Sequence, residues 1–441
     1  MARKARLKTQ LSDYFSLPEQ PFRSANLEFD YGNDEIIRQY IPTAKSAAVL
    51  NSLCNALDAE SRDRAVSLIA PYGSGKTSLF LFLCALLEKE QKTQTARTRV
   101  LRRLREIQPG LDKRIKSLVE EPSKGYVVVR LSGNQGELSS VLKAGLKEAL
   151  SRKSRGRGVN LSRIWKKAEG DKAKTQTEIL ELYRTVSKEL KRVKFEGIVV
   201  LYDEFGKIFE SHQTESRTDE LFFLQSFAEL CSRSGQSRIF LAVAMHQGFA
   251  QYAHRLPSNI RSEWVKVEGR FHVIPFVEDS LQVYDLIGQI LKTIHNKSFR
   301  AIKEQVAPLI KNMAKKDGVK SVFAGIKDKK TLTDIFTKTF PLHPVALYAL
   351  PRLSARVSQN ERTLFHFLLG PGENCLYDLL KKKNGRKKDL DLIKLYDLFD
   401  YFSELMASDN RPGGTHRRLM EMKAAMERIV PDDEFGIQLI Q

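Results

Sequence analysis

Cysteine is scarce in this chain, and the few cysteines stand apart from one another. The four, Cys54, Cys84, Cys231 and Cys375, form no CxxC pair and no cluster with histidine, so neither a zinc site nor a disulfide framework is expected. The chain also lacks an apolar run long enough to cross a bilayer, and its basic first residues lack the apolar core of a signal peptide. These absences predict a cytoplasmic protein without a membrane partner.

Acidic residues are also in short supply. The chain has 53 Asp and Glu against 73 Lys and Arg, a formal net charge of +20 at pH 7. Such an excess favours an anionic partner, above all nucleic acid; solvated lysine faces would give the same count. Hydrophobic residues make up 42% of the 441 residues, which indicates a globular protein of two or three domains.

The strongest local signal is a glycine-containing loop between an apolar strand and an apolar helix. Residues 66–78 read VSLIAPYGSGKTS, and an apolar run over 79–87 follows. This order is the context of a phosphate-binding loop, whose backbone N–H groups surround an anion at the helix N-terminus. The residues expected around the nucleotide are Pro71, Tyr72, Gly73, Ser74, Gly75, Lys76, Thr77 and Ser78.

Within this loop, Lys76 is expected to reach the β- and γ-phosphates of ATP, and the Thr77 hydroxyl to hold Mg²⁺. Ala70 replaces the first glycine of the usual motif, which alanine can do where φ is negative. The alternative is a glycine turn before a buried helix, with no ligand.

A second motif supports the nucleotide interpretation. Residues 197–207 read GIVVLYDEFGK, a continuous apolar run typical of a strand buried on both faces of a parallel sheet. Two carboxylates at its C-terminal end lie where open α/β sheets bind ligands. Asp203 is expected to hold Mg²⁺, and Glu204 to orient and deprotonate the attacking water; a solvated strand end is the alternative.

Three further apolar runs, 126–131, 239–245 and 271–276, complete a predicted α/β fold of the P-loop NTPase type with a parallel five-stranded sheet. His246 and Gln247 end the fourth strand, either near the γ-phosphate or as an ordinary strand end. Arg261 and Arg270 precede the fifth strand, where each either points into a neighbouring subunit's nucleotide site or forms a surface salt bridge.

The chain divides by composition into four predicted parts. These are an N-terminal arm over 1–45 lying on the ATPase domain, the ATPase domain over 46–277 with a basic insertion at about 91–175, a helical lid over 278–370, and a helical C-terminal region over 371–441. Within the insertion, residues 92–116 are predicted to form a helix with a cationic face. This face either contacts nucleic acid or is simply exposed to solvent. Residues 152–158 are predicted to be an exposed basic loop, and 381–388 a basic turn, either a wing or a solvated loop.

The order of APYGSGKT, LYDEFGK, a polar strand end and a basic residue before the fifth strand resembles the AAA+ and STAND branch of P-loop ATPases. More narrowly, DEFGK, AMHQGFAQYA, EGRF and LHP…SQNERTLFHFL resemble large ATP-binding proteins of prokaryotic anti-phage defence loci, over roughly residues 40–400. The resemblance implies that Asn134 is a polar switch residue facing the catalytic glutamate, that Arg270 is an arginine finger, and that Pro344 contacts the base.

The leading hypothesis is a Mg²⁺-dependent ATPase that forms a homo-oligomer, is coupled to nucleic acid and controls an effector protein. In it Glu204, Asn134, Arg261 and Arg270 are the expected catalytic residues. One alternative is a switch that retains nucleotide and changes partners with little turnover. Another is a scaffold whose basic faces bind DNA and whose nucleotide site is structural.

Overall fold

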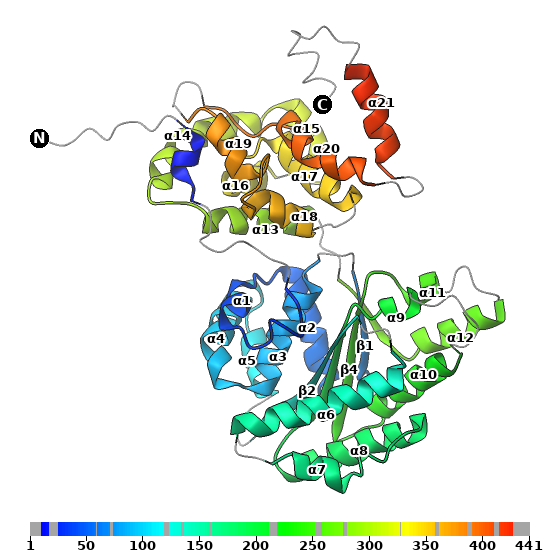
Figure 1. Ribbon diagram of the computed structural model, residues 1–441. Helices are drawn as coiled ribbons and strands as arrows, with labels where there is room; N and C mark the ends of the chain where they lie inside the picture. Colours follow the sequence, from blue (N-terminus) through cyan, green and yellow to red (C-terminus); the bar gives the residue numbers. More distant parts are fainter. Residues whose placement is uncertain are drawn as a thin grey trace, which may run out of the picture. The chain divides into compact units, whose positions relative to one another are not determined.

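The computed structural model describes residues 10–16, 25–58, 60–70, 74–118, 123–133, 136–157, 160–210, 218–252, 258–276, 280–326, 328–357, 361–385, 390–409 and 414–426. The chain forms two compact units. One unit is Ala25–Val277, and the other joins Met1–Ser24 to Glu278–Gln441. The first contains the sheet, and the described part of the second is helical (Figure 1).

The sheet of the first unit has five parallel strands. They are β1 Ala65–Ile69, β2 Tyr126–Ser132, β3 Gly197–Asp203, β4 Arg238–Met245 and β5 His272–Pro275. Their order is β2-β3-β4-β1-β5, and every pairing is parallel. The predicted α/β fold with a five-stranded parallel sheet is therefore confirmed.

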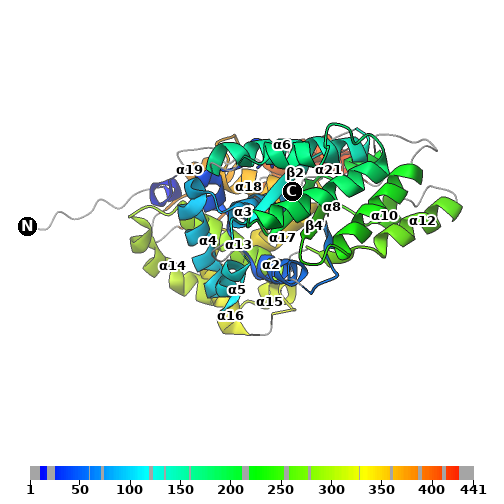
Figure 2. The same ribbon diagram turned by 90° about the horizontal axis from the view of Figure 1, so that it is seen from below.

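Alternating side chains of the strands enter two separate cores. In β2, Tyr126 and Val128 lie in one core, and Val127 and Val129 lie in the other. The first core is closed by α2 Ala44–Ala56, α3 Lys76–Glu88, α4 Gln94–Ile107 and α5 Leu111–Ser117. The second is closed by α6 Leu138–Arg157, α7 Ser162–Lys167, α8 Gln176–Arg192, α10 Thr218–Ser232 and α12 Ser258–Glu268, so helices cover both faces (Figures 1 and 2). Burial on both faces explains why β1 to β4 read as largely apolar runs, whereas the edge strand β5 is mostly exposed.

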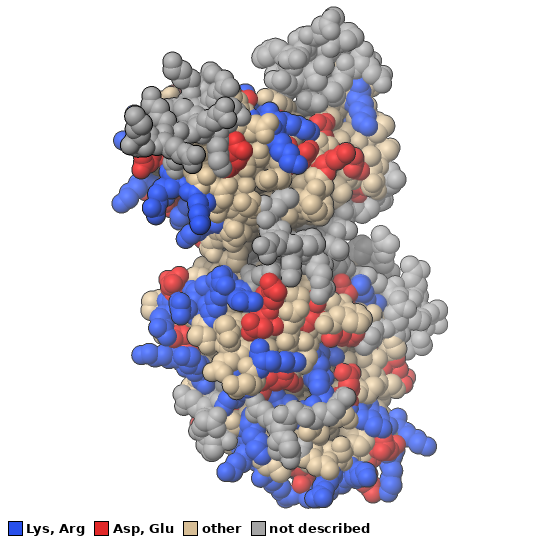
Figure 3. All heavy atoms as spheres, turned by 60° about the vertical axis from the view of Figure 1, so that its left-hand side comes forward, with Lys and Arg blue, Asp and Glu red and all other residues tan. Residues whose placement is uncertain are grey.

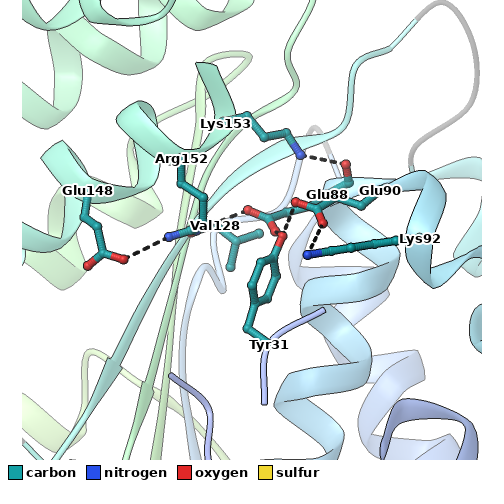
Figure 4. Close-up of polar contacts among 8 residues, drawn as sticks. All are labelled: Tyr31, Glu88, Glu90, Lys92, Val128, Glu148, Arg152 and Lys153. Carbon is teal, nitrogen blue, oxygen red and sulfur yellow. Dashed lines mark hydrogen bonds and ion pairs between the residues drawn. The ribbon is translucent and has the colours of Figure 1, made fainter. Parts of the chain in front are cut away.

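The prediction of an exposed basic loop at 152–158 is wrong. Helix α6 extends to Arg157, and the Lys153 side chain is only 3% exposed. Its Nζ donates a 2.6 Å hydrogen bond to the Glu88 carbonyl at the end of α3, and Arg152 donates one of 2.7 Å to the Val128 carbonyl on the edge strand β2 (Figure 4). These cations satisfy the carbonyls of a helix C-terminus and of a sheet edge.

A buried polar cluster joins residues near position 31 to this corner of the sheet. The Tyr31 hydroxyl donates to the carboxylates of Glu88 and Glu90 (Figure 4). The Arg130 guanidinium lies 3.3 Å from the centroid of the Tyr31 ring. The Arg152 guanidinium pairs with the Glu88 carboxylate at 3.3 Å. Burial, followed by the two carboxylates, raises the pKa of Tyr31 far above its ordinary value, so the phenol stays protonated and remains a donor.

The residues grouped as one N-terminal arm contact different units. Residues from 25 onward, with α1 Asp34–Gln39, belong to the sheet unit. The short helix η1 Leu11–Tyr14 instead packs in the second unit, where the Leu11 amide donates to the Lys383 carbonyl at 3.0 Å and the Ser16 amide to the Ile294 carbonyl at 2.8 Å. Phe15 packs there against Phe299.

The described part of the second unit is built from helices. They are α13 Ser280–Thr293, α14 Phe299–Met313, α15 Asp317–Val322, α16 Lys329–Lys338, α17 Pro344–Arg356, α18 Glu361–Leu369, α19 Leu376–Lys382, α20 Phe399–Ala407 and α21 His416–Met426. The predicted change from sheet to helices near residue 278 is confirmed. Across the described residues, every helix is too short or too polar to span a membrane.

Candidate nucleotide site at the ends of β1 and β3

Helix α3 begins where the phosphate-binding loop was predicted. Gly75 caps it with φ +78, a left-handed conformation that glycine adopts without strain. The Lys76 side chain is 9% exposed, and its Nζ donates to the Ala70 carbonyl at 2.7 Å and to Ser74 Oγ at 3.2 Å. Ser78 follows in the first turn, half-buried. The ammonium group is thus held at the N-terminus of the helix, while Pro71, Tyr72 and Gly73 lie outside the described residues.

The two predicted metal ligands lie side by side. Thr77 Oγ1 donates to Asp203 Oδ2 at 2.5 Å, which joins the start of α3 to the end of β3. The other carboxylate oxygen, Oδ1, accepts the Glu204 amide at 2.9 Å. Asp203 is 3% exposed, and burial raises its pKa although Thr77 and the Glu204 amide oppose the shift.

These residues fit a divalent cation of the Mg²⁺ type. Mg²⁺ prefers hard oxygen ligands and is commonly held by one or two protein oxygens with phosphate and water. A hydroxyl and a carboxylate in contact supply two such oxygens. A buried carboxylate is also disfavoured as an anion, so a cation there would offset its charge.

Glu204 sits in a tight turn immediately after β3. Its φ is +50, an uncommon conformation for a residue with a side chain, and such conformations concentrate at functional sites. The Phe205 amide donates to the Ala244 carbonyl of β4 at 3.0 Å, which fixes the turn to the neighbouring strand. Glu204 Oε2 accepts from Lys207 Nζ at 2.6 Å, a contact that the sequence analysis did not foresee.

The end of β2 meets this turn. The Gly133 amide donates to the Asp203 carbonyl at 3.1 Å, and a Cβ added at Gly133 would lie 3.1 Å from Glu204 Oε2. Gly133 was not among the predicted site residues, although a glycine that ends a buried strand is a usable signal for a close approach. Asn134 lies outside the described residues, so its role as a switch stays a prediction.

The end of β4 also lies beside the loop. The Ala70 amide donates to the Met245 carbonyl at 3.0 Å, which brings the half-buried His246 and Gln247 to this edge of the sheet. His246 Nδ1 is hydrogen-bonded to the Tyr252 hydroxyl at 3.0 Å, from the short helix α11 Phe249–Tyr252. Sequence reasoning missed Tyr252, because nothing local links an aromatic residue to a ring six positions earlier.

Three other predicted site residues, Arg270, Arg261 and Pro344, have no described contact with the residues at the ends of β1, β3 and β4. Arg270 pairs with Glu229 at 3.0 Å, the surface salt bridge left open as an alternative, and Arg261 is exposed on α12. Pro344 begins α17 in the second unit, after a cap in which His343 Nδ1 accepts the Val345 amide at 3.2 Å. Action in trans and contact with a base stay predictions.

The basic helix predicted over 92–116 consists of α4 and α5, and several of its cations hold the fold together. Arg103 donates to the Tyr40 carbonyl at 2.6 Å, and Arg105 pairs with Asp112 at 2.5 Å. Arg99, Arg102, Lys113 and Lys116 are exposed on these helices. Figure 3, which brings this side forward, shows Lys and Arg side chains gathered here with acidic side chains among them.

The fold is that of an α/β protein with a five-stranded parallel sheet, and the candidate site joins the start of α3 to the end of β3. Comparisons with protein-family models and with curated proteins gave no match. The chain is similar to the Aeropyrum pernix ORC2 protein in its ADPNP-ADP complexes, with a TM-score of 0.33 and 12% identity over 98% of this chain and 87% of that one. Its ADP form gives a TM-score of 0.35 and 14% identity over 92% and 87%.

Proposed function

We propose that this protein binds and hydrolyses ATP with Mg²⁺. The observation that supports the proposal is the 2.5 Å contact between Thr77 Oγ1 and Asp203 Oδ2, because it unites the two nucleotide motifs at one edge of the sheet. Lys76 lies on the adjoining turn, with its ammonium group directed to the loop. The alternative, a glycine turn without a ligand, does not explain why Lys76, Thr77 and Asp203 lie together.

In the proposed reaction the chain positions ATP and removes one proton. Lys76 binds the phosphate oxygens, and Thr77 and Asp203 would hold Mg²⁺, which when bound neutralises phosphate charge. Glu204 accepts a proton from water, whose oxygen bonds to the γ-phosphorus as the bond from that phosphorus to the β–γ bridging oxygen breaks. The products are ADP and inorganic phosphate.

Glu204→Gln is the direct test, since it keeps the size of the side chain and removes the base. ATP binding is expected to stay within about twofold, while turnover falls about 100-fold or more. Lys76→Ala should instead weaken binding. Glu181→Gln is the matched control, because Glu181 lies on α8 in a surface pair with Arg184 at 2.7 Å, with a side chain 56% exposed. Unimpaired turnover in Glu204→Gln would overturn the assignment of the base.

The proposal extends to an oligomer in which an arginine acts in trans. Arg261 and Arg270 both precede the edge strand β5 in the sequence, and the Arg270 side chain is 49% exposed. Mixing inactive Arg270→Ala subunits with inactive Glu204→Gln subunits should restore part of the activity, because a mixed interface joins an intact glutamate to an intact arginine. No recovery with Arg270→Ala or with Arg261→Ala would place catalysis within one subunit.

Coupling to nucleic acid is the second part of the proposal, and the exposed cations of α4 and α5 support it. Arg99→Ala/Arg102→Ala should weaken duplex DNA binding and reduce the slope of log affinity against log salt by about two. The control is Lys167→Ala/Lys172→Ala, which removes two positive charges as well. Lys167 ends α7 and pairs with Glu189, and Lys172 lies in the turn after α7 and pairs with Glu169. Equal losses in both variants would argue against a specific face.

A cytoplasmic role in anti-phage defence, with an effector partner, rests on the sequence resemblance. Phage plating on cells that carry the wild-type locus or Glu204→Gln tests it: protection should be lost with the variant. Protection that persists in Glu204→Gln would favour the nucleotide-retaining switch. Loss of protection only after removal of the α4 cations would favour the scaffold.

A further inference from the structure

The turn that carries Glu204 is held from both sides. Its first residue, Asp203, accepts the Glu204 amide, and the Lys207 amide donates to the Glu204 carbonyl at 3.0 Å. Phe205 is bonded to β4, as described above. This network maintains the left-handed backbone of Glu204 and directs its side chain and that of Lys207 to the same side, where α9 Lys207–Glu210 begins.

The two side chains form an ion pair beside the end of β2. Lys207 Nζ lies 2.6 Å from Glu204 Oε2, and the side chains are 43% and 38% exposed. A Cβ on Gly133 would lie 3.1 Å from Glu204 Oε2 and 3.3 Å from Lys207 Cδ. The pair therefore rests against the backbone of Gly133, and a side chain at that position would displace it by a few tenths of an ångström.

An ammonium group bonded to a carboxylate oxygen occupies the position from which a water molecule would donate its hydrogen bond to that oxygen. We propose that Lys207 is a positioning residue that latches Glu204 in a resting state and keeps basal hydrolysis low. This inference rests on the proposed function of Glu204 as the base. Release of the ammonium group frees the carboxylate, so the latch sets the rate without binding the nucleotide.

Lys207→Met tests the latch, because it keeps the length of the side chain and removes the charge. A half-exposed ion pair is a weak interaction, so the expected rise in basal kcat is about three- to fivefold, with KM unchanged. Lys207→Arg retains the charge and should keep kcat near the wild-type value. Adding Glu204→Gln to Lys207→Met should abolish the gain, since the latch acts through that carboxylate.

Two further readouts separate a latch from a structural or ligand role. The dissociation constant for a fluorescent ATP analogue should be the same in the wild type and in Lys207→Met; a loss beyond about tenfold would make Lys207 a phosphate ligand. Salt screens a half-exposed pair, so the wild-type kcat at saturating ATP should rise with salt toward that of Lys207→Met, whose own kcat should stay flat.

The outcomes distinguish the latch from the function on which it depends. If the wild type hydrolyses ATP and Lys207→Met is equal or slower, the latch is wrong and the ATPase assignment stands. If both bind ATP and neither hydrolyses it, the proposed ATPase function fails. A gain in Lys207→Met that survives Glu204→Gln would overturn the latch, because the effect would then bypass the carboxylate.

Discussion

Replacing Arg152 by methionine removes the guanidinium that pairs with the Glu88 carboxylate at 3.3 Å, where the Glu88 side chain is 1% exposed and that of Arg152 18%. Glu88 would keep the Tyr31 hydroxyl as a donor and Arg130 as a nearby cation but lose the guanidinium paired with it, and the Val128 carbonyl would lose its side-chain donor. Breaking a buried pair by removing one partner costs about 3 kcal/mol. We expect a loss of unfolding free energy of about 2–3 kcal/mol, since Arg152 retains some contact with solvent.

Tryptophan fluorescence during a urea titration reports the unfolding of the sheet unit, which contains Arg152. The chain has two tryptophans, and both Trp165 and Trp264 are buried in the sheet unit. Arg184→Met is the matched control: its pair with Glu181 is 53% and 56% exposed, so the cost should stay below about 0.5 kcal/mol.

A double-mutant cycle checks the physical reason for the loss. Glu88→Gln in the Arg152→Met background removes the carboxylate charge that has lost this guanidinium. The loss of unfolding free energy in the double variant should therefore be smaller than the sum of the two single losses by about 1–2 kcal/mol. An Arg152→Met loss no larger than that of the Arg184→Met control, or strictly additive losses in the cycle, would refute the view that buried charge dominates this corner.

Three shorter predictions test other parts of the molecule. Burial, followed by nearby lysines, lowers the pKa of His295 from 6.5 to about 4. As pH drops from 6.5 toward 4, the unfolded chain binds the proton before the folded chain does, so the free energy of unfolding should fall. Melting curves of His295→Phe should show a smaller fall over this pH range. Thr77→Ala should raise the Mg²⁺ concentration for half-maximal activity about tenfold in a titration after EDTA treatment. Gly206→Ala should cost about 2 kcal/mol in thermal melts, because the new methyl group would lie 1.8 Å from the Tyr252 hydroxyl oxygen, whereas Gly318→Ala, with nothing within 4 Å, should be close to neutral.

The sheet was predictable because β1 to β4 are buried on both faces, an environment that requires continuous apolar runs. The short edge strand β5 is exposed at His272, Val273 and Pro275, yet its run also became a strand. The contact of Thr77 with Asp203 agrees with the predicted pairing of two motifs 126 positions apart, because the C-terminal ends of parallel strands meet at one edge. Local pattern and fold class were sufficient for both.

The uses of the cations were less predictable. Residues 152–158 have the composition of an exposed loop, but the Lys153 side chain is 3% exposed. Gly156 did not end α6. On the turn before it, Arg152 and Lys153 are bonded to carbonyls of β2 and of the end of α3, which holds this turn in place. Composition alone does not distinguish a solvent-exposed Lys or Arg side chain from one that donates a hydrogen bond to a buried carbonyl.

The sequence by itself determined the fold class, the order of the strands along the chain, and the two motifs from which the nucleotide site is proposed. Each of these follows from interactions within a short segment, namely apolar periodicity, glycine conformation and helix N-terminal geometry. The tertiary structure alone decided that β4 lies between β1 and β3, that residues 10–16 pack in the helical unit, and that Gly133 opens the space beside Glu204 and Lys207. These features depend on which distant segments come into contact, and packing between such segments leaves no periodic trace in either of them.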